Sequence, residues 1–205
     1  MMRWKAQLIT ATGAAALALV GCTQGVTLPG GAAAQTAPKS AVVAHATGLQ
    51  HTAQPKRLDV VAEIDMGEFS FSAPGVQGRP VIKVPSGKTV GLHLHNEGAV
   101  MHEIVIGRKP VQMVEKVVSG TKVSVPDGYA KALFEDLEAD VFFYYSDTIK
   151  AEVGGAKFGE IEMDAGLRDV WLRVKFPPEA RGEWEIGCFA EGHYEAGMYA
   201  TLIVE

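Results

Sequence analysis

The residues with the clearest chemistry lie in one short segment near the carboxyl end of the chain. Cys188, His193 and Met198 are each separated by four residues, in the pattern C-x4-H-x4-M. A stretch typical of a β-strand precedes this segment and another follows it, so the loop between them can bring a thiol, an imidazole and a thioether to one point. Soft sulfur and borderline nitrogen ligands suit both Cu(I) and Cu(II). The spacing therefore predicts a mononuclear metal site, and copper is the metal that fits it.

A trigonal copper site of this kind needs a second imidazole. His102 is the best candidate, because the segment that begins at Asn96 and ends at Met101 follows one predicted strand and His102 opens the next. A ring at a strand end can turn toward a loop, whereas a ring in the middle of a strand is held on one face of the sheet. Asn96, Met101 and Glu103 are therefore expected close to the metal, around the ligand His102.

These residues and their spacing resemble the cupredoxin family, which includes plastocyanin, azurin and rusticyanin. The resemblance covers about residues 58–205 and is tightest over 184–205, where Gly-His-Tyr-Glu-Ala-Gly-Met occupies 192–198. In that family the first histidine comes from an upstream strand end, and the cysteine, second histidine and methionine come from the last loop. The resemblance implies that one type 1 copper ion is held by His102, Cys188, His193 and Met198.

The same resemblance implies a function. A type 1 copper protein passes electrons between redox partners, here a c-type cytochrome or a terminal oxidase, and is not an enzyme. The ring of His193 would lie beneath an apolar docking patch, formed by Phe189, Ala190, Gly192 and Ala196 and completed by Ala99, Val100 and Met101. A protein for copper tolerance, storage or delivery would use the same four ligands, so that function stands as the alternative.

Two features depart from the family pattern. Glu103 follows the first ligand, where plastocyanins and azurins commonly carry an asparagine that ties the two ligand loops together. In addition, 85 residues separate His102 from Cys188, more than plastocyanin has. We expect residues 107 to about 165 to form an insertion beside the core.

Other metal chemistry fits less well. A structural zinc site uses four Cys or His ligands and no Met. A dinuclear copper centre needs two cysteines in the loop, and a trinuclear oxidase cluster needs repeated His-x-His pairs, whereas this chain has only the pair His93 and His95. These two histidines alternate onto one face of a predicted strand. They are either solvated surface residues, which we favour, or a surface copper port.

The amino terminus has the profile of an export signal. Arg3 and Lys5 precede an uncharged apolar stretch over residues 6–21, which is shorter than a spanning helix. The stretch ends in Leu-Val-Gly-Cys and resembles the lipobox of bacterial lipoproteins, which implies cleavage before Cys22 and acylation of its thiol. We therefore expect residues 1–21 to be a signal peptide and the protein to be anchored by lipid on the periplasmic side of a bacterial membrane. Thr23 favours the outer membrane in a Gram-negative host.

The composition places one domain after a linker. Residues 22–56 are poor in large apolar and acidic residues, which predicts a flexible tether, and 57–205 then form the folded domain. The 205-residue chain has a formal charge of −5 and no Lys/Arg-rich run. These features exclude the electrostatic footprint of a nucleic-acid-binding protein.

Short β-rich runs separated by Gly and Pro turns fill the domain, which predicts an all-β Greek-key sandwich or barrel. One helical pattern interrupts them. Over Tyr129–Ala139, apolar residues recur at i, i+3, i+4 and i+7 from Ala130, which predicts a helix within the insertion. A second, shorter helix is expected over Val111–Val118.

Overall fold

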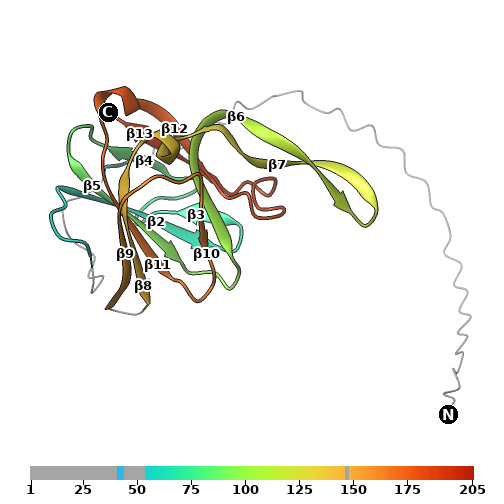
Figure 1. The fold of residues 1–205 in the computed structure, drawn as a ribbon, viewed down its shortest axis with the longest axis horizontal. Helices are drawn as coiled ribbons and strands as arrows, with labels where there is room; N and C mark the ends of the chain where they lie inside the picture. The colour runs from blue at the N-terminus through green and yellow to red at the C-terminus, as the bar shows by residue number, and fades with distance from the viewer. Residues whose placement is uncertain (1–40, 44–53, 146–147) are drawn as a thin grey trace, which may run out of the picture. The chain divides into compact units, whose positions relative to one another are not determined.

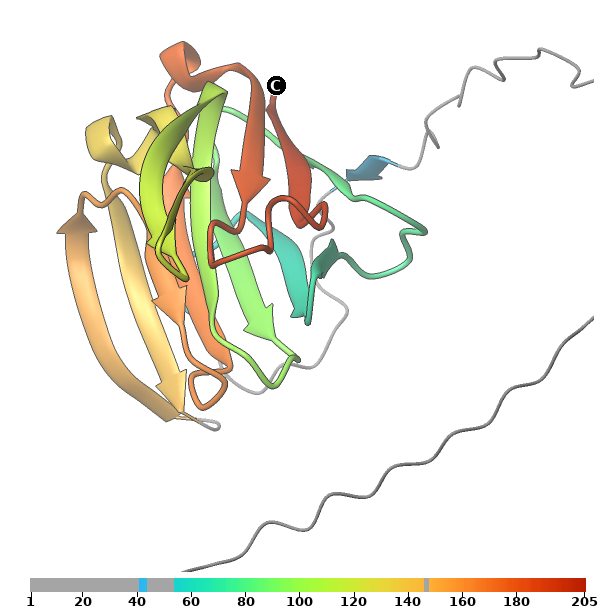
Figure 2. The ribbon, with the colours of Figure 1, turned by 90° about the vertical axis from the view of Figure 1, so that its right-hand side faces the viewer.

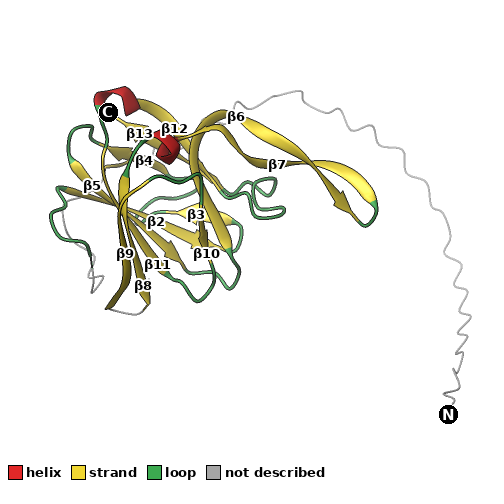
Figure 3. Cartoon of the chain, in the orientation of Figure 1, coloured by secondary structure: helices red, strands yellow, loops and turns green. Residues whose placement is uncertain are grey.

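The computed structural model describes residues 41–43, 54–145 and 148–205, and within them strands far outnumber helices (Figure 3). One sheet has seven strands: β1 (Ala41–Val43), β4 (Val81–Val84), β6 (His102–Val118), β7 (Thr121–Ala132), β10 (Ile161–Met163), β12 (Gly182–Gly187) and β13 (Tyr199–Val204). The other has six: β2 (Val60–Gly67), β3 (Ser70–Ser72), β5 (Thr89–Asn96), β8 (Ala139–Tyr145), β9 (Thr148–Ala156) and β11 (Asp169–Lys175).

The order of strands in each sheet brings distant parts of the chain together. The first sheet runs β1-β4-β13-β12-β6-β10, with β7 also paired to β6, and the second runs β3-β2-β5-β11-β8-β9. Because β12 pairs antiparallel with both β6 and β13, the start of β6 lies beside the end of β12. This pairing places the two predicted ligand segments next to each other.

The core lies between the sheets, as the alternation along their strands requires. In β2 every second side chain is buried, including Ile64, and in β5 Leu92 and Leu94 are fully buried on the face that meets the core, while His93 is buried on the other face. The three apolar residues pack in one cluster with residues of the other sheet, such as Ile186 and Leu202. The predicted all-β sandwich is confirmed.

The predicted helices are wrong apart from one turn. Val111–Val118 belongs to β6, and the segment from Tyr129 to Ala132 belongs to β7. The only α-helical turn in the described part of the chain is α1 (Leu133–Asp136), and the short 3-10 helix η1 (Pro178–Ala180) lies far along the chain. Long-range pairing of β6 with β7 overrides a local pattern that fits a helix equally well.

The expected insertion instead begins with a long two-stranded ribbon, which extends beyond the rest of the sheet (Figure 1). Val118 pairs with Thr121, so Ser119 and Gly120 form a two-residue turn, and both have positive φ, 51° and 82°. This is the backbone that tight hairpins prefer, because its twist matches that of the strands. The hairpin therefore closes a continuous ribbon where two helices were expected.

The segment expected to be a tether contains one short strand. Ala41–Val43 form β1 and pair in parallel with Val81–Lys83 of β4. The predicted signal peptide, Cys22 and the remainder of the tether before Gln54 lie outside the described residues. Among the described residues, no helix is long and apolar enough to cross a bilayer.

A partly exposed ion pair links β8 to β9 and β11 and gives a pH-dependent prediction. Asp140 Oδ2 accepts hydrogen bonds from Arg173 Nη2 at 2.9 Å and Nε at 3.0 Å, and Oδ1 accepts one from the Gly155 N–H at 2.9 Å. The Gly155 N–H, opposed by partial burial and assisted by Arg173, holds the pKa of Asp140 below its usual value. A carboxylate with a lowered folded-state pKa stabilises the fold at neutral pH and loses that contribution as pH falls through this pKa.

Asp140→Asn is expected to lower the free energy of unfolding at pH 7 by about 1 kcal/mol, the scale of a partly exposed ion pair with hydrogen bonds. The difference from wild type should shrink below about pH 3.9, the ordinary pKa of Asp. Urea unfolding of wild type and variant at pH 7 and at low pH measures the stability difference and its decrease. Glu152→Gln is the control, because Glu152 lies 3.9 Å from Arg173 and is half-exposed, and it should change little. An equal difference at both pH values would contradict the assignment.

Candidate metal centre

Three segments of the seven-stranded sheet supply the predicted ligands. His102 is the first residue of β6, Cys188 directly follows β12, and His193 and Met198 lie in the loop that leads into β13. Figure 2 shows this loop, in red, at the ends of the last two strands. All four residues are buried, and Cys188, His102 and Met198 are fully enclosed.

The distances between the ligand atoms fit one metal ion. Cys188 Sγ lies 3.3 Å from His193 Nδ1 and 3.8 Å from His102 Nδ1. A metal with bonds of about 2.0 Å to nitrogen and 2.3 Å to sulfur, at trigonal angles, separates these atoms by about 3.7 Å. One ligand atom from each of His102, Cys188 and His193 lies within 4.8 Å of the others. The site therefore accommodates copper with little movement of its side chains.

Met198 is tied to the other loop ligands through the backbone. The Cys188 N–H donates to the Met198 carbonyl at 3.1 Å, and the Met198 N–H donates to the His193 carbonyl at 3.0 Å. Gly192 and Gly197 have φ values of 80° and 99°, which a tight loop of this length requires and which glycine adopts without strain. These contacts close the loop around the site, where the buried Met198 thioether would serve as a fourth, weaker ligand.

The protonation states of the two imidazoles favour metal binding, whereas that of the thiol does not. Burial, followed by the nearby His193, lowers the pKa of His102, and burial lowers the pKa of His193. Both imidazoles are therefore neutral at pH 7, as metal ligation requires. Burial raises the pKa of the Cys188 thiol, against the N–H groups of Glu103 and Ala190 that lower it. The thiol proton is therefore released when a metal binds.

Glu103 ties the two ligand segments together through its backbone. Its N–H donates to Cys188 Sγ at 3.4 Å, across 85 positions of sequence. A backbone donor needs no particular side chain, so the absence of asparagine at this position does not remove the link. The Glu103 side chain has a raised pKa, from burial and from the nearby Glu160 and Glu162.

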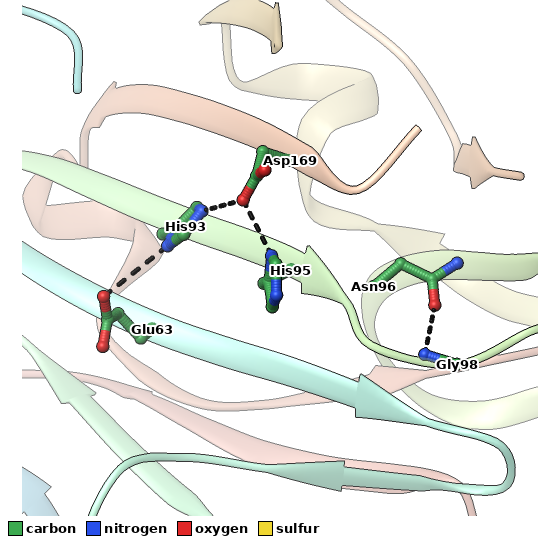
Figure 4. A network of polar contacts seen from close by, with 6 residues as sticks. All are labelled: Glu63, His93, His95, Asn96, Gly98 and Asp169. Carbon is green, nitrogen blue, oxygen red and sulfur yellow. Dashed lines mark hydrogen bonds and ion pairs between the residues drawn. The ribbon is translucent and has the colours of Figure 1, made fainter. Parts of the chain in front are cut away.

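Asn96 holds the segment before the first histidine. Its fully buried amide donates to the carbonyls of Val100 at 3.1 Å and Met163 at 3.2 Å, and its oxygen accepts from the Gly98 N–H at 2.9 Å (Figure 4). Met163 is also the strand partner of His102. Asn96 therefore positions the loop that covers His102.

The surface beside His193 differs from the predicted docking patch. Phe189 and Ala190 are buried at 5% and 7% exposure, whereas Gly192 is exposed and Met101 is half-buried. Phe189 turns inward because its ring stacks on Tyr194 at 4.8 Å. Two of the predicted patch residues are therefore absent from the surface.

Phe69 takes their place, and sequence reasoning missed it. Its ring meets His193 edge-on at 4.8 Å and remains 54% exposed. Glu68, its neighbour, accepts a hydrogen bond from the Ala99 N–H at 2.8 Å, which brings the β2–β3 turn against the loop that carries exposed Val100. An apolar residue at the tip of a tight turn, between Glu68 and Ser70, was the available signal. We define Phe69, Val100, Met101 and Gly192 as the His193 patch.

The fold and the ligand set define the class of protein. A mostly β two-sheet sandwich carries His102 at the start of one strand, with Cys188, His193 and Met198 in the loop between its last two strands. This arrangement is cupredoxin-like, and its four side chains would hold a type 1 copper ion. Copper bound there would supply one-electron chemistry by cycling between Cu(I) and Cu(II).

Comparison with known proteins gives similarity only at the level of solved structures. No protein-family model and no curated protein matches the chain. Auracyanin B superposes with a TM-score of 0.40 at 19% identity, over 71% of this chain and 88% of that protein. Rusticyanin from Thiobacillus ferrooxidans superposes with a TM-score of 0.38 at 20% identity, over 71% of this chain and 77% of rusticyanin. A multicopper oxidase from Campylobacter jejuni superposes with a TM-score of 0.45 at 13% identity, over 77% of this chain and 32% of the oxidase.

Proposed function

We propose that this chain is an electron carrier that cycles one type 1 copper ion between Cu(I) and Cu(II). The observation that carries the proposal is the ligand set itself: two neutral imidazoles, a thiol and a thioether enclosed by the sandwich. Such a site leaves no ligand position for a substrate and needs little rearrangement when its charge changes by one. It is suited to passing electrons and poorly suited to activating a substrate.

The side chains around the site have separate tasks. Cys188 and the two histidines hold the metal, and burial of all three keeps water away from it. His193, at 7% exposure, lies directly beneath Phe69 and thus closest to an exposed apolar side chain. We propose that the His193 patch is where a redox partner docks, because a small apolar contact allows quick binding and release.

The location and partner belong to the same proposal. We propose that Cys22 carries a lipid and anchors the chain on the periplasmic side of a bacterial membrane, through the tether, in the outer membrane of a Gram-negative host. The partner would be a c-type cytochrome or a terminal oxidase. Metabolic labelling with a fatty-acid analogue tests the anchor: wild type should be labelled and Cys22→Ala should not. Equal labelling of both would refute it.

The electron-carrier function is tested by stopped-flow mixing of the reduced, copper-loaded protein with oxidised cytochrome c. Electron exchange on the timescale of respiration is expected, with slow loss of copper to a chelator. A protein that exchanges no electrons but gives up copper readily to an acceptor would instead be a tolerance, storage or delivery protein. Phe69→Asp should slow the exchange without changing the absorption of the copper site.

The axial role of Met198 predicts a change in reduction potential. Met198→Leu removes the weak sulfur ligand, keeps the volume and should retain copper. The potential should rise, because loss of a donor disfavours Cu(II), and a rise of about 59 mV is a tenfold shift in the one-electron equilibrium. A redox titration measures it. Met66→Leu, at a fully buried methionine of β2 outside the ligand loops, is the control, and loss of all copper in Met198→Leu would show that Met198 is a strong ligand.

A further inference from the structure

A second group of potential metal ligands lies on the six-stranded sheet, apart from the copper ligands. His93 and His95 share one face of β5, and the register pairs His95 with Asp169 of β11 and His93 with Trp171. On the other side of β5, the register pairs His93 with Glu63 of β2. Two imidazoles and two carboxylates therefore meet on one face (Figure 4). None of these residues belongs to the copper centre.

The ligand atoms are already gathered around one point. Asp169 Oδ1 lies 2.8 Å from His93 Nε2 and 2.8 Å from His95 Nδ1, and one ligand atom from each of these three residues lies within 4.8 Å of the others. A tetrahedral ion with bonds of about 2.1 Å separates its ligand atoms by about 3.4 Å. Each of the two 2.8 Å separations has to increase by only about 0.6 Å to receive such an ion.

The remaining nitrogen of His93 meets a carboxylate, as in many metal sites. Its Nδ1 lies 3.6 Å from Glu63 Oε1, while its Nε2 faces Asp169. A carboxylate behind a ligating histidine fixes the ring orientation and increases the basicity of the ligating nitrogen. Glu63 is in the position to do this for His93.

The ring of His93 is held rigidly for a residue on the outer face of a sheet. It is 1% exposed and stacks on Trp171, with centroids 4.3 Å apart and planes 12° apart. Gly91 lies two residues earlier on the same face, and its lack of a side chain lets Trp171 and Leu58 pack there. A Cβ at Gly91 would lie 3.2 Å from the Trp171 ring and 2.6 Å from Leu58. A ligand whose rotamer is set by packing loses little entropy on binding an ion.

The charge and the exposure of the group favour entry of a cation. Asp65 lies close to this group, as the influences on its pKa show. Burial and the nearby Glu97 and Glu63 raise the pKa of Asp65, while His95 and His93 lower it. By strand register and contact, three carboxylates, those of Glu63, Asp65 and Asp169, thus face the two imidazoles. The side chains of His95 and Asp169 are 21% and 25% exposed, so an ion can reach the group from solvent and keep a water as a further ligand.

We propose that His93, His95 and Asp169 form a second cation site for a borderline divalent ion such as Zn²⁺ or Cu²⁺, with Glu63 orienting His93. Two imidazoles and one carboxylate suit these ions, whereas Mg²⁺ and Ca²⁺ prefer oxygen ligands throughout. The three proposed ligands come from β5 and β11, and the site does not depend on the electron-transfer function. An ion there would cross-link the two central strands of the six-stranded sheet.

Calorimetric titration of Zn²⁺ into the copper-loaded, untagged protein tests the proposal. One Zn²⁺ per chain should bind without loss of the copper absorption. His95→Ala and Asp169→Asn should each weaken this binding at least about tenfold. Losing a residue that only supports a metal ligand already lowers metal affinity by about that much. A double variant, His45→Ala with His51→Ala, is the matched control for histidines elsewhere in the chain and should bind Zn²⁺ as wild type does.

Three results would overturn the proposal: no Zn²⁺ binding by copper-loaded wild type, binding that displaces copper, or binding that survives His95→Ala but not the control double variant. Thermal unfolding of His95→Ala and Asp169→Asn establishes that each variant is folded during the titration. A Cys188→Ser, His193→Ala chain separates this proposal from the copper centre, because it should retain the His95-dependent binding of Zn²⁺. Titration of the same chain with Cu²⁺ and with Mg²⁺ tests the class of ion, and binding of Mg²⁺ as tightly as Zn²⁺ would contradict it.

Discussion

Replacing Cys188 by serine is expected to abolish the intense absorption that we predict for wild type with Cu(II), at about 600 nm, or at about 450 nm for a distorted site. The absorption arises from charge transfer between the thiolate sulfur and copper, and a serine oxygen cannot supply it. Copper affinity should fall more than about 100-fold. That is the largest loss expected for a residue that only supports a ligand, and a ligand itself should contribute more. Anaerobic titration with Cu(I) and with Cu(II) measures the affinity, and the optical spectrum measures the band.

The fold of the Cys188→Ser variant should survive. Serine is close to cysteine in volume, and its oxygen can accept the hydrogen bond that the Glu103 N–H makes to Sγ at 3.4 Å. The metal-free variant should therefore unfold within about 1–2 kcal/mol of metal-free wild type, the scale of one buried polar replacement. A folded variant that retained the intense band would contradict the assignment of Cys188 as a ligand. A colourless Cu(II) complex of the wild type would contradict the whole ligand set.

Tyr129→Ala is expected to have the largest effect on stability outside the main core, about 3 kcal/mol, as for other buried aromatic truncations. Tyr129 is 5% exposed and belongs to β7 of the ribbon. Its ring meets that of Phe189 edge-on at 5.0 Å, and Phe189 is next to Cys188 in the chain. The ribbon therefore packs against the beginning of the ligand loop, which assigns the inserted segment a structural task.

The Tyr129 ring packs closely against the backbone of β6, so truncating the side chain is expected to lower stability. A Cβ at Gly107 would lie 2.5 Å from the Tyr129 ring, so glycine is needed where the ring crosses β6. The Tyr129 hydroxyl donates to Glu185 Oε1 at 3.1 Å, and Tyr194 of the ligand loop donates to the same oxygen at 2.7 Å. The truncation leaves a cavity between the ribbon and the loop and frees one end of this link.

Tyr129→Phe is the matched control, because it keeps the ring and loses only the hydrogen bond, at about 1 kcal/mol. Urea unfolding of the metal-free proteins compares the three chains. In the copper-loaded proteins, Tyr129→Ala should also broaden or shift the copper absorption, since Phe189 loses its neighbour, whereas Tyr129→Phe should not. Equal stability of wild type and Tyr129→Ala would show that the ribbon does not support the site.

Much of the copper site was predictable because its spacing is local. Cys188, His193 and Met198 lie within eleven residues, so their convergence depends on one loop, whose closure needs only short-range hydrogen bonds and glycine at 192 and 197. His102 was predictable because it stands at the junction of two strand patterns. The structure of residues 129–139 was not predictable: a helix was expected there, but the segment forms the end of β7 and the single turn α1. Apolar spacing at i, i+3, i+4 and i+7 is also compatible with a strand when both faces find neighbours.

The sequence by itself determined which residue types could bind copper and that His93 and His95 share one face, since both follow from spacing within a single loop or strand. Only the tertiary structure decided what lies against them. Strand pairing brings Glu103 to Cys188, Asp169 to the two histidines and the β2–β3 turn with Phe69 to His193. These contacts join residues from 74 to 124 positions apart, and the pairing register that makes them is set by burial of the whole core and not by any local pattern.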